Sequence, residues 1–177
     1  DLSVSRGLGD VYKRQSSDSI YGLLGPNGAG KTSLFSILAG LSKPSEGEVL
    51  YDSKIVNNLS FEKRSELGVI YLPQEPSVFR ELTVEENIKA ALEAKKYEKK
   101  EIDNKFTRIS EEFDLMNIKT QKCNSLSGGQ RRRVEIARAI ALNPKLILLD
   151  EPFAGIDPLI INEIKTLIKN LKEKGIG

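Results

Sequence analysis

The sequence predicts an α/β fold in which short buried strands alternate with amphipathic helices. Two apolar runs without polar alternation, "SIYGLLG" (19–25) and "KLILLDE" (145–151), are typical of strands buried on both faces. The stretch "SKPSEGEVLYDSKIV" (42–56) alternates turn and strand signals, which predicts an antiparallel piece. Residues 76–125 have helical periodicity only. The expected architecture is therefore an α/β core with an antiparallel β edge and a helical subdomain.

Each further element has its own signal. The first predicted helix follows residue 30 and has four apolar residues on one face: Leu34, Ile37, Leu38 and Leu41. "GVIYLPQ" (68–74) is expected to be a strand that Pro73 ends. Thr83 and Glu86 have the spacing of a capping box, which predicts a helix start. A second helix follows from apolar residues at i, i+4, i+7 and i+11: Ile102, Phe106, Ile109 and Phe113. Helical patterns also end at Asn143-Pro144 and at Gly175.

Composition limits the classes of function. With 27 basic and 25 acidic residues the net charge is +2, which argues against a nucleic-acid-binding surface. The single cysteine, Cys123, excludes an internal disulfide framework and fits a reducing compartment. No apolar run approaches the roughly 18 residues of a membrane span, so no direct membrane insertion is expected.

The chain is expected to divide into four parts. Residues 1–15 have no sustained helical or strand period, and we interpret them either as a leader foreign to the domain or as a disordered native one. Residues 16–75 are the predicted first part of the core, and residues 76–125 the helical subdomain. Residues 126–177 begin with a helix after two glycines and complete what is present of the core. The pattern "IG" at 176–177 reads as the first step of an unfinished strand.

A phosphate-binding loop is the strongest chemical signal. "GPNGAGKT" fits the pattern G-x-x-x-x-G-K-[ST], in which backbone amides surround phosphate oxygens at a helix N-terminus. Lys31 is expected to reach the β- and γ-phosphates, and the Thr32 hydroxyl to bind Mg²⁺. The alternative, a glycine-rich turn without ligand, is weak in this context. The predicted nucleotide-binding residues here are Gly25, Pro26, Asn27, Gly28, Ala29, Gly30, Lys31, Thr32 and Ser33.

Acidic residues at a strand end predict the second half of this site. Asp150 and Glu151 follow "LILL" and should lie at the sheet edge where ligands of open α/β sheets bind. Asp150 suits Mg²⁺, either as a direct ligand or in its outer coordination sphere. Glu151 suits a general base that polarises water for attack on the γ-phosphate. Gln74, at the end of another strand, is interpreted as a sensor that touches Mg²⁺ or the attacking water. Without the phosphate loop, the acidic pair would be read as a helix cap.

The stretch "LSGGQ" predicts a second phosphate contact. Ser127 and Gln130 have capping-box spacing, but a capping box does not require Gly128 and Gly129, which cost helix stability. Bare glycines at a helix N-terminus allow an anion to approach. Since the chain already has one phosphate loop, we expect this second phosphate to belong to ATP held by another copy of the chain. Asp157 in "AGIDP" is the predicted interface residue of that homodimer.

These motifs, in this order, resemble the nucleotide-binding subunits of ABC transporters. The resemblance covers residues 19–177 and implies a RecA-like P-loop NTPase core that dimerises head to tail around two ATP–Mg²⁺. Within the family, "IYLPQEPSVFRELTVEENI" and "RRRVEIARAIALNPKLILLDEPFAGIDP" resemble the ATPases of lipopolysaccharide-export systems. That resemblance implies a place on the cytoplasmic face of the inner membrane and a groove for integral-membrane subunits. The groove residues would be Pro76, Ser77, Val78, Phe79 and Arg80; for Phe79 an ordinary loop anchor is the alternative.

Other functions remain open at this point. The motifs also fit the ATPase of a branched-chain amino-acid importer. A non-transport ABC ATPase usually has two cassettes or a long coiled-coil insertion, and a degenerate module would lack Lys31, Asp150 or Glu151. The family's adenine-stacking aromatic residue is not assigned, and its switch histidine has no counterpart because the chain contains no histidine. The resemblance thus implies a chain shortened at both ends, which as it stands could be inactive.

Overall fold

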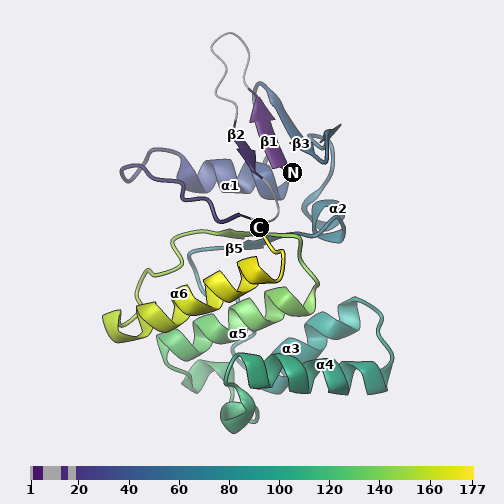
Figure 1. Ribbon diagram of the computed structural model, residues 1–177, viewed down its shortest axis with the longest axis vertical. Coiled ribbons are helices and arrows are strands. Elements are labelled where there is room, and N and C mark those ends of the chain that lie inside the picture. Colours follow the sequence, from purple (N-terminus) through teal and green to yellow (C-terminus); the bar gives the residue numbers. More distant parts are fainter. Residues whose placement is uncertain (1, 6–12, 16–18) are drawn as a thin grey trace. The chain divides into compact units, whose positions relative to one another are not determined.

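The computed structural model describes residues 2–5, 13–15 and 19–177, with side chains described for 19–177. The chain forms two compact units, each built from separate segments (Figure 1). The first unit contains the residues up to Tyr71 together with 145–150 and 169–177. The second contains 72–144 and 151–168. The subdomain boundaries expected at 76 and 125 stay predictions.

An antiparallel sheet of order β2-β1-β3-β4 belongs to the first unit. Its strands are β1 (Leu2–Ser5), β2 (Lys13–Gln15), β3 (Glu48–Tyr51) and β4 (Lys54–Ile55). The hairpin of β3 and β4 pairs Leu50 with Ile55 and confirms the predicted antiparallel edge. Leu2–Ser5 pairs with β3, although residues 1–15 have no sustained strand period in the sequence. Main-chain pairing does not need an alternating side-chain pattern. The adenine-stacking residue stays unassigned, and Tyr12, its only candidate in the sequence, lies outside the described residues.

The remaining strands and two helices complete the first unit. Strands β5 (Val69–Leu72) and β6 (Leu146–Leu149) form a two-stranded sheet, as expected for both segments. The Ile147 amide donates to the Gly177 carbonyl at 2.9 Å, so the chain end runs beside β6. Helix α1 (Lys31–Ala39) packs on a core that includes Leu38, Val49 and Leu148. The short helix α2 (Phe61–Glu66), which Ser60 caps, was not predicted from the sequence.

Two sequence-based expectations fail in this unit. Residues 19–25 are not a strand: they form no ladder among the described residues, and Leu24 is 93% exposed. A strand needs a neighbouring main chain, which an apolar run cannot specify by itself. Leu41 was expected on the buried face of the first helix but is 53% exposed, because α1 ends at Ala39 with Gly40 in a left-handed conformation.

The second unit is helical. It contains α3 (Val84–Ala94), α4 (Lys99–Glu112), α5 (Gly128–Ala141) and the first part of α6 (Pro158–Glu173), with short 3₁₀ turns at Met116–Ile118 and Cys123–Ser125. Helix α3 lies against both α4 and α5. The four periodic residues, Ile102, Phe106, Ile109 and Phe113, are all buried as predicted. The Thr83–Glu86 capping box is also formed. Within residues 19–177, no helix has the length and apolar character needed to cross a membrane.

Candidate functional site

The phosphate-binding loop has an open backbone cradle. Residues 24–30 are all exposed, and the Ala29 amide donates to the Pro26 carbonyl to close the turn. Gly28 and Gly30 have φ of 81° and 83°, a left-handed conformation that favours glycine. A Cβ atom at either position would have nothing within 4 Å. These glycines are therefore required by backbone conformation, and the space beside them is free for a ligand.

Helix α1 begins directly at this loop. Its N-cap is Gly30, which offers no side-chain cap, and its first turn contains no acidic residue. The first amides of a helix have no intrahelical acceptor, so the α1 N-terminus is a positive end without a local counter-charge. The Lys31 ammonium curls back over the loop and donates to the carbonyls of Gly25 at 2.9 Å and Pro26 at 3.0 Å. Thr32 and Ser33 are exposed beside it.

Asp150 lies at the end of β6 and is only 2% exposed. Its Oδ2 accepts a hydrogen bond from the Tyr71 hydroxyl at 3.2 Å, although 79 positions separate the two residues. Burial, and then the charge of Asp150 and the hydrogen bond to it, raise the pKa of Tyr71 to about 12. The phenol is therefore protonated at neutral pH and acts as the donor. A carboxylate at this sheet edge agrees with the sequence expectation.

Glu151 has an unusual backbone. Its φ is 43°, the left-handed region that a non-glycine residue enters at a cost, and such conformations cluster at functional sites. Its side chain is exposed and lines a pocket of about 270 Å³ in the second unit. Gln74 and Gly128 line the same pocket. The fold thus brings together residues of three sequence motifs that are 23 to 77 positions apart.

The glycine motif at 127–130 combines a cap with close packing. Gln130 Oε1 accepts from the Ser127 amide at 2.9 Å, and Ser127 Oγ accepts from the Gln130 amide at 3.2 Å, so the expected capping box is formed. We expected both glycines to leave room for an anion. At Gly129 the absence of a side chain also has a packing role, because a Cβ there would lie 2.7 Å from Ile160 Cγ2 of the same chain. At Gly128 the nearest atom is the Gly155 carbonyl oxygen at 3.4 Å, an ordinary contact.

Among the three arginines that follow this motif, Arg132 is buried in the second unit. Arg132 is 6% exposed, and its Nη1 lies 2.8 Å from Glu135 Oε2. Glu135 also accepts from the Ser77 amide at 2.7 Å. The buried pair forms because Arg132 and Glu135, at i and i+3, share the face of α5 that meets residues 73–77. Sequence periodicity gave no signal that these charges would be inside.

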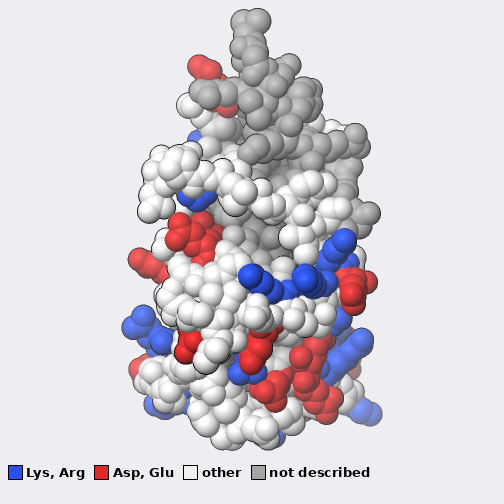
Figure 2. All heavy atoms as spheres, turned by 60° about the vertical axis from the view of Figure 1, so that its left-hand side comes forward, with Lys and Arg blue, Asp and Glu red and all other residues white. Residues whose placement is uncertain are grey.

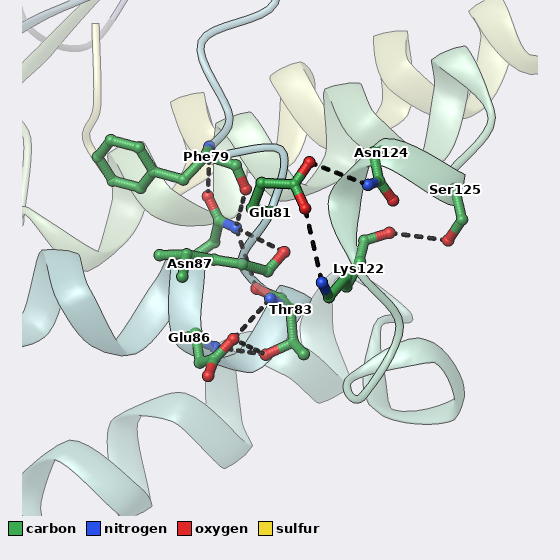
Figure 3. A network of polar contacts seen from close by, with 9 residues as sticks. Phe79, Glu81, Thr83, Glu86, Asn87, Lys122, Asn124 and Ser125 are labelled. Carbon is green, nitrogen blue, oxygen red and sulfur yellow. Dashed lines mark hydrogen bonds and ion pairs between the residues drawn. The ribbon is translucent and has the colours of Figure 1, made fainter.

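The main chain of residues 76–80 is hydrogen-bonded to side chains of two helices, α3 and α5. The Asn87 side chain accepts from the Phe79 amide at 2.9 Å and donates to the Phe79 carbonyl at 3.0 Å (Figure 3). Arg138 donates to the Ser77 carbonyl at 2.8 Å. The Phe79 ring is nevertheless 53% exposed, with the Arg138 guanidinium 4.7 Å from its centroid. The sequence analysis missed both Asn87 and Arg138. A polar residue inside the α3 apolar pattern was the one available signal for Asn87.

Asp157 is exposed and precedes α6. Its Oδ1 accepts from the Leu159 amide at 2.9 Å, so within its own chain it caps this helix.

On the face drawn in Figure 2, basic and acidic side chains lie interspersed, in agreement with the balanced composition.

Comparisons with known proteins agree with this geometry. Residues 9–154 match the ABC transporter family. The lipopolysaccharide export system ATP-binding protein of Haemophilus influenzae is 46% identical over 171 residues, which are 96% of this chain and 71% of that protein. The Escherichia coli K12 protein of the same description is 43% identical over 173 residues, 97% of this chain and 72% of that protein.

Solved structures are similar over almost the whole chain. The ADP conformation of an ATP-binding cassette of an ABC transporter has a TM-score of 0.84 at 31% identity, covering 99% of this chain and 78% of that one. A dimeric post-hydrolysis cassette bound to ADP and phosphate has a TM-score of 0.83 at 28% identity, covering 98% and 84%. The mixed α/β architecture is thus a RecA-like P-loop core of the cassette type. With its phosphate loop, acidic strand end and glycine motif in this order, the chain belongs to the ABC transporter family.

Proposed function

We propose that this chain binds and hydrolyses ATP as a subunit of an ABC transporter and that the transporter exports lipopolysaccharide. The observation that carries the chemistry is the convergence of Gln74, Gly128 and Glu151 on one pocket. The export assignment rests on relatives that are 43–46% identical and are described as lipopolysaccharide export ATP-binding proteins. By the same reasoning, the subunit works on the cytoplasmic face of the inner membrane.

The phosphate loop would hold the triphosphate. Gly25 to Gly30 offer an open backbone, and the α1 N-terminus offers a positive end for the phosphate oxygens. The Lys31 ammonium, which now rests on two loop carbonyls, would exchange those neutral acceptors for the β- and γ-phosphates. Thr32 and Ser33, exposed in the first turn, would contact the same group.

Mg²⁺ fits the residues available. The Asp150 carboxylate is only 2% exposed, and the described side chain that donates to it is the neutral phenol of Tyr71. A divalent cation would supply a counter-charge for this buried carboxylate. The Thr32 hydroxyl, the Asp150 carboxylate and the Gln74 amide are oxygen donors of the kind that Mg²⁺ prefers. When bound, the ion would neutralise charge that builds up on the phosphates during transfer.

Glu151 would act as the general base on the attacking water. Its left-handed backbone directs an exposed carboxylate to the pocket that Gln74 also lines, so one water could contact both side chains. Gln74 would then report the state of the γ-phosphate to residues 76–80, which follow it directly in the chain.

Two copies would share each nucleotide. The first two amides of α5, those of Gly128 and Gly129, have no intrahelical acceptor and are suited to the γ-phosphate of ATP on a partner. Ser127 and Gln130 would hold that helix start in place through their capping box, and exposed Asp157 would face the partner. A related cassette has been solved as a dimer bound to ADP and phosphate.

The experiment that tests this function replaces Glu151 with Gln. The variant keeps the size of the side chain and loses the base, so ATP should still bind while turnover falls by about a hundredfold or more. ATP should then accumulate a stable dimer, measured by light scattering after size exclusion at saturating ATP–Mg²⁺.

Glu75→Gln is the matched control, because Glu75 is an exposed glutamate in the same unit that does not line the pocket. It should hydrolyse ATP at the wild-type rate. A Glu151→Gln protein that stays monomeric with bound ATP would contradict the shared site, and one that retains full turnover would contradict the assigned base.

A further inference from the structure

We propose that Tyr71 is a positioning residue for the Mg²⁺ site and that its hydroxyl holds the Asp150 carboxylate in the orientation that binds the metal. The inference rests on the proposed function, since it concerns the metal that accompanies ATP. It adds a residue outside the phosphate loop, the acidic pair and the glycine motif.

The Tyr71 hydroxyl donates a hydrogen bond to one of the two oxygens of the Asp150 carboxylate. The hydroxyl lies 3.2 Å from Asp150 Oδ2, and among the described side chains no other donor is recorded on this carboxylate. Occupation of Oδ2 leaves Oδ1 for a cation. Since Asp150 is 2% exposed, bulk water cannot orient the group in the phenol's place.

The Tyr71 ring is itself held in place. It packs edge-on against Phe35 of α1, with ring centroids 6.4 Å apart and an interplanar angle of 79°. It also lies against the buried cluster that contains Val69 and Leu148. A phenol on a packed ring is a fixed donor, and outer groups of this kind orient metal-binding carboxylates. The same contacts join Tyr71 of β5, Asp150 after β6 and the helix that carries Thr32.

If the Tyr71 hydroxyl only stabilised the fold, its removal should have the same effect as removal of another buried tyrosine hydroxyl. Tyr51 is the matched control for this comparison. Tyr51 belongs to the same core, is 7% exposed, and donates from its hydroxyl to the Leu67 carbonyl at 3.0 Å. Tyr51→Phe and Tyr71→Phe each remove one phenol donor from this core and keep the ring. Loss of stability alone would therefore affect both variants in a similar way.

The test measures metal binding directly. Mn²⁺ binding to the ADP complex is followed by electron paramagnetic resonance, and ADP affinity is measured by calorimetry with Mg²⁺ and with EDTA. Tyr71→Phe should bind Mn²⁺ about tenfold more weakly or worse, the range found for groups that orient metal ligands. ADP affinity in EDTA should be unchanged, and Tyr51→Phe should equal wild type in both measurements.

A double-mutant cycle of Tyr71→Phe with Asp150→Asn tests whether Tyr71 changes the Mn²⁺ affinity through Asp150. If Tyr71 acts through Asp150, Tyr71→Phe should have no further effect on Mn²⁺ affinity once Asp150 is Asn. Equal Mn²⁺ affinity of Tyr71→Phe and wild type, or an equal loss of ADP affinity in EDTA, would overturn the inference. Failure of the proposed function looks different: wild-type protein would then bind no nucleotide with or without metal, and both proposals would fall.

Discussion

At the scale of the residue, Arg64 holds a positive charge inside the first unit without a carboxylate partner among the described residues. It is 1% exposed and donates to four carbonyls: Ile37 at 2.6 Å, Val56 at 2.7 Å, Leu38 at 2.9 Å and Leu59 at 3.3 Å. Burial lowers the pKa of Arg64 from its ordinary value. Two of the acceptors are last-turn carbonyls of α1, so the guanidinium lies at the negative end of the helix that begins at the phosphate loop.

Replacement of Arg64 by Met should destabilise the protein by about 2–4 kcal/mol, because buried carbonyls lose their donors while the side-chain volume stays similar. Urea unfolding followed by circular dichroism measures the free-energy difference. Lys63→Met, an exposed neighbour on the same helix, should change it by less than about 0.5 kcal/mol. Equal unfolding free energies for the two variants would show that the carbonyls find other donors.

At the scale of the element, the packing of α5 against α6 gives one glycine of the 127–130 motif a structural role. Gly129 is buried, and a Cβ there would lie 2.7 Å and 2.9 Å from two carbons of Ile160. Gly128, one position earlier, has only the ordinary 3.4 Å contact. Adjacent glycines that look equivalent in the sequence therefore have different roles: Gly129 permits close helix packing, and Gly128 leaves the surface open.

Gly129→Ala should destabilise the protein by about 1–2 kcal/mol, because overpacking outweighs the gain in helix propensity. Gly128→Ala should be neutral or slightly stabilising. Thermal unfolding of the two variants provides the comparison. Ile160→Ala should remove the penalty of Gly129→Ala in a double-mutant cycle; additive effects of the two changes would contradict the proposed clash.

At the scale of the whole molecule, assembly with membrane subunits is expected to depend on residues 76–80. Their main chain is fixed by Asn87, Arg138 and Glu135, while the Phe79 ring remains half exposed. A rigid loop that presents an exposed aromatic ring is suited to a partner's apolar pocket. The basic guanidinium of Arg138 below the ring would hold it outward.

Phe79→Ala should abolish co-purification with the membrane subunits while ATP affinity stays at the wild-type level. The measurement is pull-down of detergent-solubilised complexes with identification of the captured subunits. Leu41→Ala is the control, since Leu41 is also 53% exposed but belongs to the other unit. Capture of amino-acid permease subunits would show that the transporter carries amino acids and not lipopolysaccharide. If Phe79→Ala captured the membrane subunits as well as wild type does, residues 76–80 would not be the binding site for those subunits.

Features that depend on neighbours along the chain could be predicted from the sequence alone. The phosphate loop, both capping boxes and the buried face of α4 follow from spacings of three to eleven residues, over which backbone geometry is nearly fixed. Contacts between segments that are distant in the sequence were found only in the folded structure. In the structure residues 19–25 do not form a strand, Ile160 lies against Gly129, and the Tyr71 hydroxyl donates to Asp150. Arg64 and Arg132 are also buried in the folded structure. A charged side chain can be buried where the fold places hydrogen-bond acceptors around it, and the local sequence pattern does not show where those acceptors will lie.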